Sequence, residues 1–145
     1  MADFTFVRAL NGMTPQTELR TAGGAMEVGD LVVFGTSGED IAAKVTKAGD
    51  AATRATLAGV CQGKHQEDGE AIADGDLIQM MPLTSDMLLE CTQSDTLGDV
   101  GDSLDLNVAS DVQTVVATAA APMAKIFKIV DTTAKTIQIR LLGEV

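Results

Sequence analysis

The segment 124–142 has the sequence AKIFKIV-DTTAK-TIQIRLL, in which two alternating runs flank a short polar stretch. Successive side chains of a β-strand point to opposite faces, so such alternation gives one buried and one solvated face. A few polar and small residues between the runs suit a hairpin connection. The segment therefore predicts an antiparallel hairpin with one apolar face.

Short runs with the composition of β-strands also occupy the rest of the chain, separated by turn signals. These runs are Leu31–Phe34, Ile41–Val45, Leu57–Gly63, Leu77–Leu83, Met87–Cys91, Ser103–Val108 and Gln113–Ala117. No segment repeats its apolar residues with a helical period over ten or more residues. The sequence predicts an all-β fold of about nine strands, a small β-barrel or β-sandwich with under about 15% helix.

The dipeptide Gly-Asp comes just before three of these runs, at Gly29-Asp30, Gly75-Asp76 and Gly101-Asp102. Glycine can adopt a positive φ, and the aspartate carboxylate can accept hydrogen bonds from the amides of a turn. We therefore expect three structural turns at strand entries. Their spacings of 46 and 26 residues are unequal, which argues against a solenoid or a propeller.

The N-terminal run Phe4–Leu10 also alternates, but Asn11-Gly12 and Thr14-Pro15 separate it from the rest of the chain. We predict an extended arm over residues 1–20 and a single β-barrel domain over residues 21–145. Phe4 and Phe6 lie two residues apart and so share a face, which could fill apolar pockets on a partner. The alternative is an ordinary first strand of the same barrel.

Length and composition exclude several classes of protein. A chain of 145 residues with 46% hydrophobic residues is long and apolar enough to fold as one domain. Its apolar runs are about five residues long, against the roughly 20 that a membrane helix needs. The first residues show no secretory signal, and Cys61 and Cys91 lack metal or redox spacing. We expect free thiols in a protein made in a reducing compartment.

Charge is distributed unevenly along the chain. Residues 65–124 contain 12 acidic residues and no Lys or Arg, whereas the other 85 residues contain 9 acidic and 10 basic ones. A net charge of −11 argues against nucleic acid and anionic membranes as partners, because both are bound through Lys and Arg. We expect the middle of the chain to face solvent and the near-neutral ends to meet a partner.

No pattern of catalytic residues is present, and we predict that the chain is not an enzyme. His65 lies in a polar stretch, neither cysteine has an activating neighbour, and no glycine-rich phosphate loop occurs. Four aspartates between Asp95 and Asp105 could suit calcium, but their spacing fits no calcium-binding loop. A strand there would also point Asp102 and Asp105 to opposite faces. We predict no cofactor and no metal.

Several segments together resemble the small capsid decoration, or cement, proteins of tailed bacteriophages. These segments are Val28–Val32, Leu57–Val60, Asp74–Gln79, Val100–Leu104 and the hairpin Lys128–Val130 with Thr136–Leu141. The resemblance implies a β-barrel or β-tulip-like body with an extended arm. It also implies binding to the major capsid protein on the outside of a capsid as homotrimers or dimers, which stabilises the virion. Such proteins are made in the host cytoplasm.

Six residues near the two ends are the candidate partner-binding residues: Phe4, Phe6, Arg8, Lys125, Lys128 and Arg140. Two other functions stay open. One is another phage structural β-barrel, such as a tail-tube or head-completion subunit. The other is a small non-catalytic ligand-binding module, although the absence of Trp and Tyr disfavours a sugar site.

Overall fold

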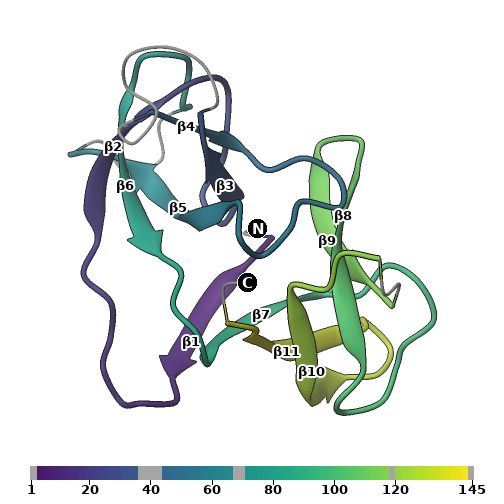
Figure 1. Ribbon diagram of the computed structural model, residues 1–145. Helices are drawn as coiled ribbons and strands as arrows, with labels where there is room; N and C mark the ends of the chain where they lie inside the picture. Colours follow the sequence, from purple (N-terminus) through teal and green to yellow (C-terminus); the bar gives the residue numbers. More distant parts are fainter. Residues whose placement is uncertain (1–2, 36–43, 67–70, 118–119, 144–145) are drawn as a thin grey trace. The chain divides into compact units, whose positions relative to one another are not determined.

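The computed structural model describes residues 3–35, 44–66, 71–117 and 120–143, and these residues form strands, turns and loops but no helix (Figure 1). The strands are β1 (Thr5–Ala9), β2 (Glu18–Ala22), β3 (Leu31–Phe34), β4 (Lys44–Lys47), β5 (Leu57–Lys64), β6 (Leu77–Pro82), β7 (Met87–Thr92), β8 (Ser103–Ala109), β9 (Val112–Val116), β10 (Ala124–Asp131) and β11 (Thr136–Leu141). The prediction of an all-β fold is confirmed.

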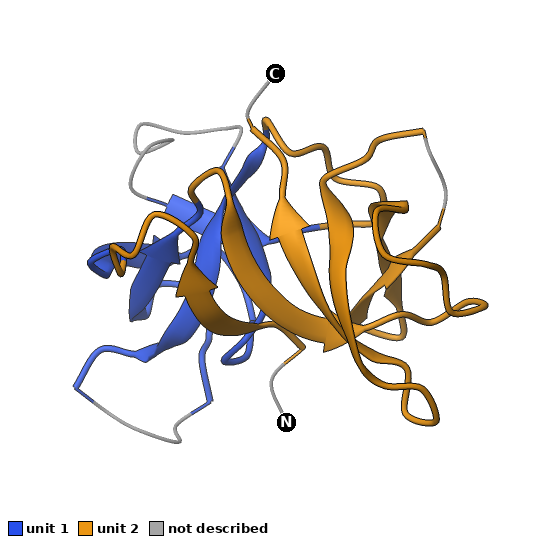
Figure 2. Ribbon diagram, turned by 90° about the horizontal axis from the view of Figure 1, so that it is seen from below, with its two compact units in different colours: residues 1–2, 15–48, 56–83 blue, residues 3–14, 49–55, 84–145 orange. Residues whose placement is uncertain are grey.

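The chain folds into two compact units, and each unit is built from separate stretches of sequence (Figure 2). The first unit contains the described residues of 15–48 and 56–83, and the second contains 3–14, 49–55 and those of 84–145. These units do not match the expected division into an arm over 1–20 and one barrel domain over 21–145. Strands β2 to β6 belong to the first unit, and the remaining strands belong to the second.

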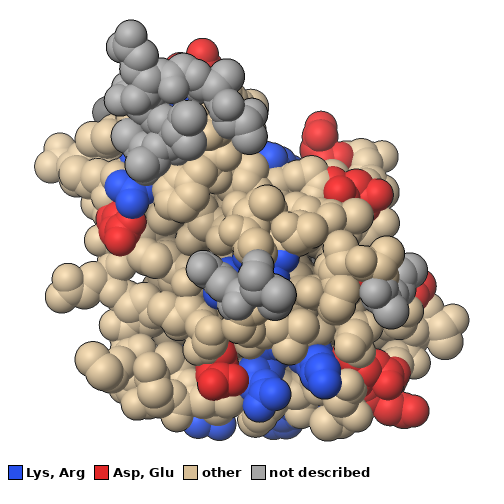
Figure 3. All heavy atoms as spheres, in the orientation of Figure 1, with Lys and Arg blue, Asp and Glu red and all other residues tan. Residues whose placement is uncertain are grey.

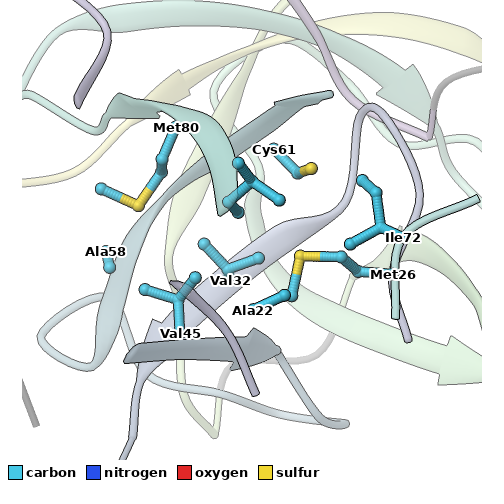
Figure 4. Close-up of a cluster of buried hydrophobic side chains, with 9 residues drawn as sticks. Ala22, Met26, Val32, Val45, Ala58, Cys61, Ile72 and Met80 are labelled. Carbon is cyan, nitrogen blue, oxygen red and sulfur yellow. The ribbon is translucent and has the colours of Figure 1, made fainter. Parts of the chain in front are cut away.

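The first unit is a closed barrel with the strand order β2-β4-β3-β5-β6. Strands β2 and β4 run parallel, and every other neighbouring pair in the barrel is antiparallel. Small and medium-sized apolar side chains fill its interior and point toward one another (Figure 4). They are Ala22, Met26, Val32, Val45, Ala58, Cys61, Ile72, Ile78 and Met80. Burial of this cluster provides the main driving force for closing the barrel.

The second unit is a six-stranded sheet with the order β1-β7-β11-β10-β8-β9. Strands β10 and β11 form the hairpin predicted from segment 124–142. Its alternation holds, because Ile126, Ile137 and Ile139 are buried while Lys125 and Arg140 are exposed. One face of the hairpin therefore packs into a core and its other face is largely exposed.

All three Gly-Asp turns form, and they share one hydrogen-bonding pattern. Their glycines have φ values of 90°, 90° and 97° at Gly29, Gly75 and Gly101. The carboxylates of Asp30, Asp76 and Asp102 accept hydrogen bonds from the amide three residues earlier, at 2.8, 2.8 and 2.9 Å. The predicted role of both residue types is confirmed, since positive φ suits glycine and the carboxylate caps the turn.

Each turn is also anchored to a neighbouring strand through one residue. Cys61, Ala22 and Ile126 accept a hydrogen bond from the turn glycine at 2.8 Å, and their own amides donate to the carbonyl of the turn aspartate. The same hydrogen-bonded turn thus occurs twice in the barrel and once in the six-stranded sheet.

Burial distinguishes the first two turns, and we expect it to set the cost of removing their carboxylates. The Asp30 side chain is 2% exposed and lies 3.6 Å from the Lys47 Nζ, whereas that of Asp76 is 27% exposed. We expect Asp30→Ala to lower the free energy of unfolding by about 2–3 kcal/mol and Asp76→Ala by about 1 kcal/mol. Urea unfolding of the two variants measures the difference, and equal losses would contradict it.

Residues 3–10 differ from the expected arm. Strand β1 pairs with β7 along its length, with a bulge between Phe6 and Arg8, and Phe4 just before it is 1% exposed. Residues 18–22 of the expected arm form β2 of the barrel. The segment behaves as an ordinary first strand, which was the alternative, but it belongs to the six-stranded sheet. Burial of Phe4 removes the apolar surface that the arm hypothesis left exposed.

Candidate interaction face

The structure separates the six candidate partner-binding residues into two groups. Phe4 is buried and Phe6 is half-buried, so neither is presented as a free anchor for a partner. The four cations are exposed: Arg8 on β1, Lys125 and Lys128 on β10, and Arg140 on β11. Only the cations are therefore available to meet another molecule.

Strand register places these four cations on one face of the six-stranded sheet. Lys125 lies opposite Arg140, Arg140 lies opposite Leu88, and Leu88 lies opposite Arg8. Residues directly opposite one another point to the same side of a sheet. Lys128 lies opposite Gln138, which is two residues from Arg140 and therefore shares its face. We call these four residues the cationic face.

Carboxylates do not neutralise the cationic face. Glu90 lies on it opposite Gln138, and Asp131 lies opposite Thr136. Asp86 pairs with Arg140 at 3.7 Å, but both side chains are largely exposed, so the pair contributes little. Figure 3 shows Lys and Arg side chains gathered at the lower edge of the view, beside a few acidic ones. Four cations against three carboxylates is a positive excess in a chain of net charge −11.

Lys125 and Arg140 also oppose each other directly across β10 and β11. Opposite residues in an antiparallel pair have Cα atoms roughly 4.5–5.5 Å apart, and like charges at that spacing destabilise a sheet. In the described part of the chain, Arg8, Lys125 and Lys128 form no ion pair. This arrangement costs the isolated protein stability, and an anionic partner would offset the cost.

Exposed apolar side chains accompany the cations on β10. Phe127 is 36% exposed and Val130 is 47% exposed, each within a register shift of the β10–β11 ladder. Sequence reasoning did not select these two residues, because it took only the charged side chains of the hairpin as candidates. Strict alternation from Lys125 already puts Phe127 on the exposed face. Val130 would share the face of buried Ile126, so its exposure depends on the register shifts.

The acidic segment 65–124 contributes both core and surface. Its strands β6 and β7 contain buried residues such as Met80 and Leu89, whereas Asp86, Asp99 and Asp102 are exposed. Asp105 is buried and its carboxylate accepts hydrogen bonds from the Ala121 amide. Among the described residues of this segment, the acidic side chains other than Asp105 are thus exposed or half-buried, although the segment as a whole is not at the surface.

Three of the aspartates between Asp95 and Asp105 accept hydrogen bonds through their carboxylates, namely Asp95, Asp102 and Asp105. The Asp95 carboxylate accepts from the Gln93 side chain at 2.8 Å and from the Ala117 amide at 3.0 Å. Buried Gln93 also donates to the Thr96 carbonyl and accepts from the Gly98 amide. Within the described residues, no three His, Cys, Asp or Glu side chains are placed to share a metal ion.

The cysteines and the histidine show packing rather than reactivity. Both thiols are free and buried, and burial is the main cause that raises the pKa of Cys61 and Cys91. The negative charge of Glu90 raises the pKa of Cys91 further. A raised pKa keeps a thiol protonated and unreactive at neutral pH. His65 forms a hydrogen bond of 2.8 Å with the Gln79 side chain.

A scan against models of protein families and a search among curated proteins found no match to this chain. Among the described residues, none lies in a helix long and apolar enough to cross a membrane. The cationic face is the feature of the described structure that folding does not explain.

Proposed function

We propose that this chain is a virion structural protein that binds the outer surface of a phage capsid and stabilises it. The observation that carries the proposal is the cationic face, an exposed positive excess on a strongly acidic molecule. Complementary charge speeds encounter and suppresses wrong partners, and such a face suits an acidic protein surface. The rest of the surface is acidic and would repel the same acidic partner, which confines binding to the cationic face.

The segments behind the resemblance to capsid decoration proteins give a second line of support. The three Gly-Asp turns and the closing hairpin are ordered structural elements, each with a defined hydrogen-bonding role. A rigid sheet that presents fixed charges loses little conformational entropy on binding, which suits a protein that adds stability to a particle.

Co-sedimentation tests the proposal. Capsids are assembled from the major capsid protein encoded in the same genome, mixed with the purified chain and pelleted. We expect the chain to pellet with the capsids and to raise their temperature of disruption, because a ligand that binds only the intact state stabilises it. Binding should weaken as salt is added, since exposed charges are screened within roughly 8–10 Å at physiological ionic strength.

The matched control is a charge change outside the face. Lys125→Glu/Lys128→Glu should reduce pelleting, while Lys44→Glu on β4 should leave it unchanged. No pelleting of the unmodified chain at low salt would contradict the proposal. Pelleting with purified tails instead of capsids would favour a tail subunit.

A further inference from the structure

We propose that the cationic face binds the acidic turn Asp99–Asp102 of a second copy of this chain. The inference does not rest on capsid binding, because both surfaces belong to the protein itself, and the turn of a second copy would compete with a capsid for the face. Each lies within the second unit, the face on β1, β10 and β11 and the turn just before β8.

A comparison of the three Gly-Asp turns identifies the acidic partner. In the first turn Asp30 lies 3.6 Å from the Nζ of Lys47. In the second turn Asp74 and Asp76 lie 3.8 and 3.7 Å from the Nζ atoms of Lys44 and Lys64. Lysines of the same chain therefore accompany Asp30, Asp74 and Asp76 in the first two turns.

The third turn differs from the other two. Among the described residues, no ion pair joins Asp99 or Asp102 to a cation, although both residues are exposed. Its backbone is bonded to Ile126, and Lys125 precedes that residue without pairing to the turn. Among the described residues, this turn has exposed carboxylates without a cation, and Arg8, Lys125 and Lys128 of the cationic face have no ion pair. Two copies of the chain would complete each other.

The shape and chemistry of the third turn also suit the face. Val100 at its tip is 65% exposed, between the two carboxylates. Gly101 at φ 97° and the bond from the Asp99 amide to the Asp102 carboxylate hold the turn in place. An apolar tip flanked by carboxylates matches a surface on which Phe127 and Val130 lie beside lysines. A preformed tip reduces the entropy lost on binding.

Each of the other two turns lacks either the apolar tip or the two exposed carboxylates. The first exposes Val28 at its tip, but Asp30 is buried. The second carries Asp74 at its tip and has no apolar residue there. The third turn alone among them combines an apolar tip with two exposed carboxylates, so the complementary surface is specific to it.

Because each copy carries both surfaces, two copies can pair reciprocally about a two-fold axis, or each copy can bind the next head to tail. Head-to-tail contacts close into rings when the rotation between copies permits it. Self-association of the unmodified chain should weaken as salt rises from about 0.1 M to 1 M, because the Debye length falls from about 10 Å to 3 Å. At lower salt the net charge of −11 on each copy adds a long-range repulsion that opposes association.

A complementation experiment tests the inference by sedimentation of the protein alone. The face variant is Lys125→Glu/Lys128→Glu, and the turn variant is Asp99→Asn, which removes a charge without introducing an opposite one and spares the capping carboxylate of Asp102. Each variant alone should associate about tenfold or more weakly than the unmodified chain. An equimolar mixture should form heterodimers and nothing larger, because the face variant keeps its turn and the turn variant keeps its face.

Three results would overturn the inference. They are an unmodified chain that stays monomeric at about 0.1 M salt, variants that associate as strongly as it does, and a mixture that stays monomeric. Lys44→Glu is the matched control and should associate normally. Thermal unfolding of the face variant guards against misfolding, and we expect no loss of melting temperature, because Lys125→Glu replaces a like-charge pair with Arg140 by an opposite-charge one.

Discussion

Replacing Phe4 by alanine is expected to lower the free energy of unfolding of the six-stranded sheet by about 3–4 kcal/mol. Phe4 is 1% exposed and belongs to the second unit, just before β1. Truncation removes a whole buried ring and leaves a cavity that the surrounding sheet can only partly close. Asp3 beside it accepts a hydrogen bond from the Gln113 amide at 2.9 Å, so disturbance at this position should also reach β9.

Phe6→Ala provides the matched control, because Phe6 is the same residue type two positions along and only half-buried. We expect it to cost about 1 kcal/mol, in line with the smaller apolar area removed from water. Amide hydrogen exchange in β7 and β11 measures the effect within this unit separately from the barrel. If both variants keep the exchange rates of the unmodified protein, residues 3–10 form a dispensable arm.

Local sequence patterns predicted most of the strands. Runs such as Leu31–Phe34 and Leu57–Gly63 lie within a residue of β3 and β5, because β-branched and apolar residues bounded by turn signals leave few alternatives. The Gly-Asp turns were predicted together with their mechanism. Strand β2 was missed, since Glu18–Ala22 carries mostly polar or exposed residues and its pairing with β6 is a tertiary property.

The division into two units could not be read from composition. The segment 49–55 belongs to the second unit although residues on both sides belong to the barrel. It is held there by long-range bonds, such as the one from the Arg54 side chain to the Leu142 carbonyl at 2.8 Å. No local pattern indicates a partner 88 residues away in sequence. Part of the predicted strand Ile41–Val45 lies outside the described residues, and β4 begins at Lys44.

The candidate face was only partly predictable for the same reason. Charge asymmetry selected Arg8, Lys125, Lys128 and Arg140 from the near-neutral ends of the chain. Their common location depends on the register of β1, β7, β11 and β10, which the sequence does not show. Phe4 was selected for its apolar character, which instead serves the core. An apolar residue near a chain end can pack into the core or contact a partner, and only its burial in the folded chain distinguishes the two roles.

Replacing Gly59 by alanine is expected to destabilise the barrel by about 3 kcal/mol. A Cβ atom at Gly59 would lie 2.5 Å from the Met81 carbonyl oxygen and 2.6 Å from the Met80 Cγ. The carbonyl cannot retreat easily, because Val60 and Met81 are partners in the β5–β6 ladder of the closed barrel. A glycine usually weakens a strand, but this one is required by the close approach of a neighbouring backbone.

Gly24→Ala is the control in the same unit, since a Cβ atom there would meet nothing within 4 Å. Its backbone also lies outside the left-handed region, so alanine should be neutral or stabilise by up to about 1 kcal/mol through loss of freedom in the unfolded chain. Hydrogen exchange in β5 and β6 should accelerate strongly for Gly59→Ala and stay unchanged for Gly24→Ala. Equal protection in the two variants would show that β5 and β6 can separate by the width of a methyl group without opening the barrel, which the filled interior around Met80 argues against.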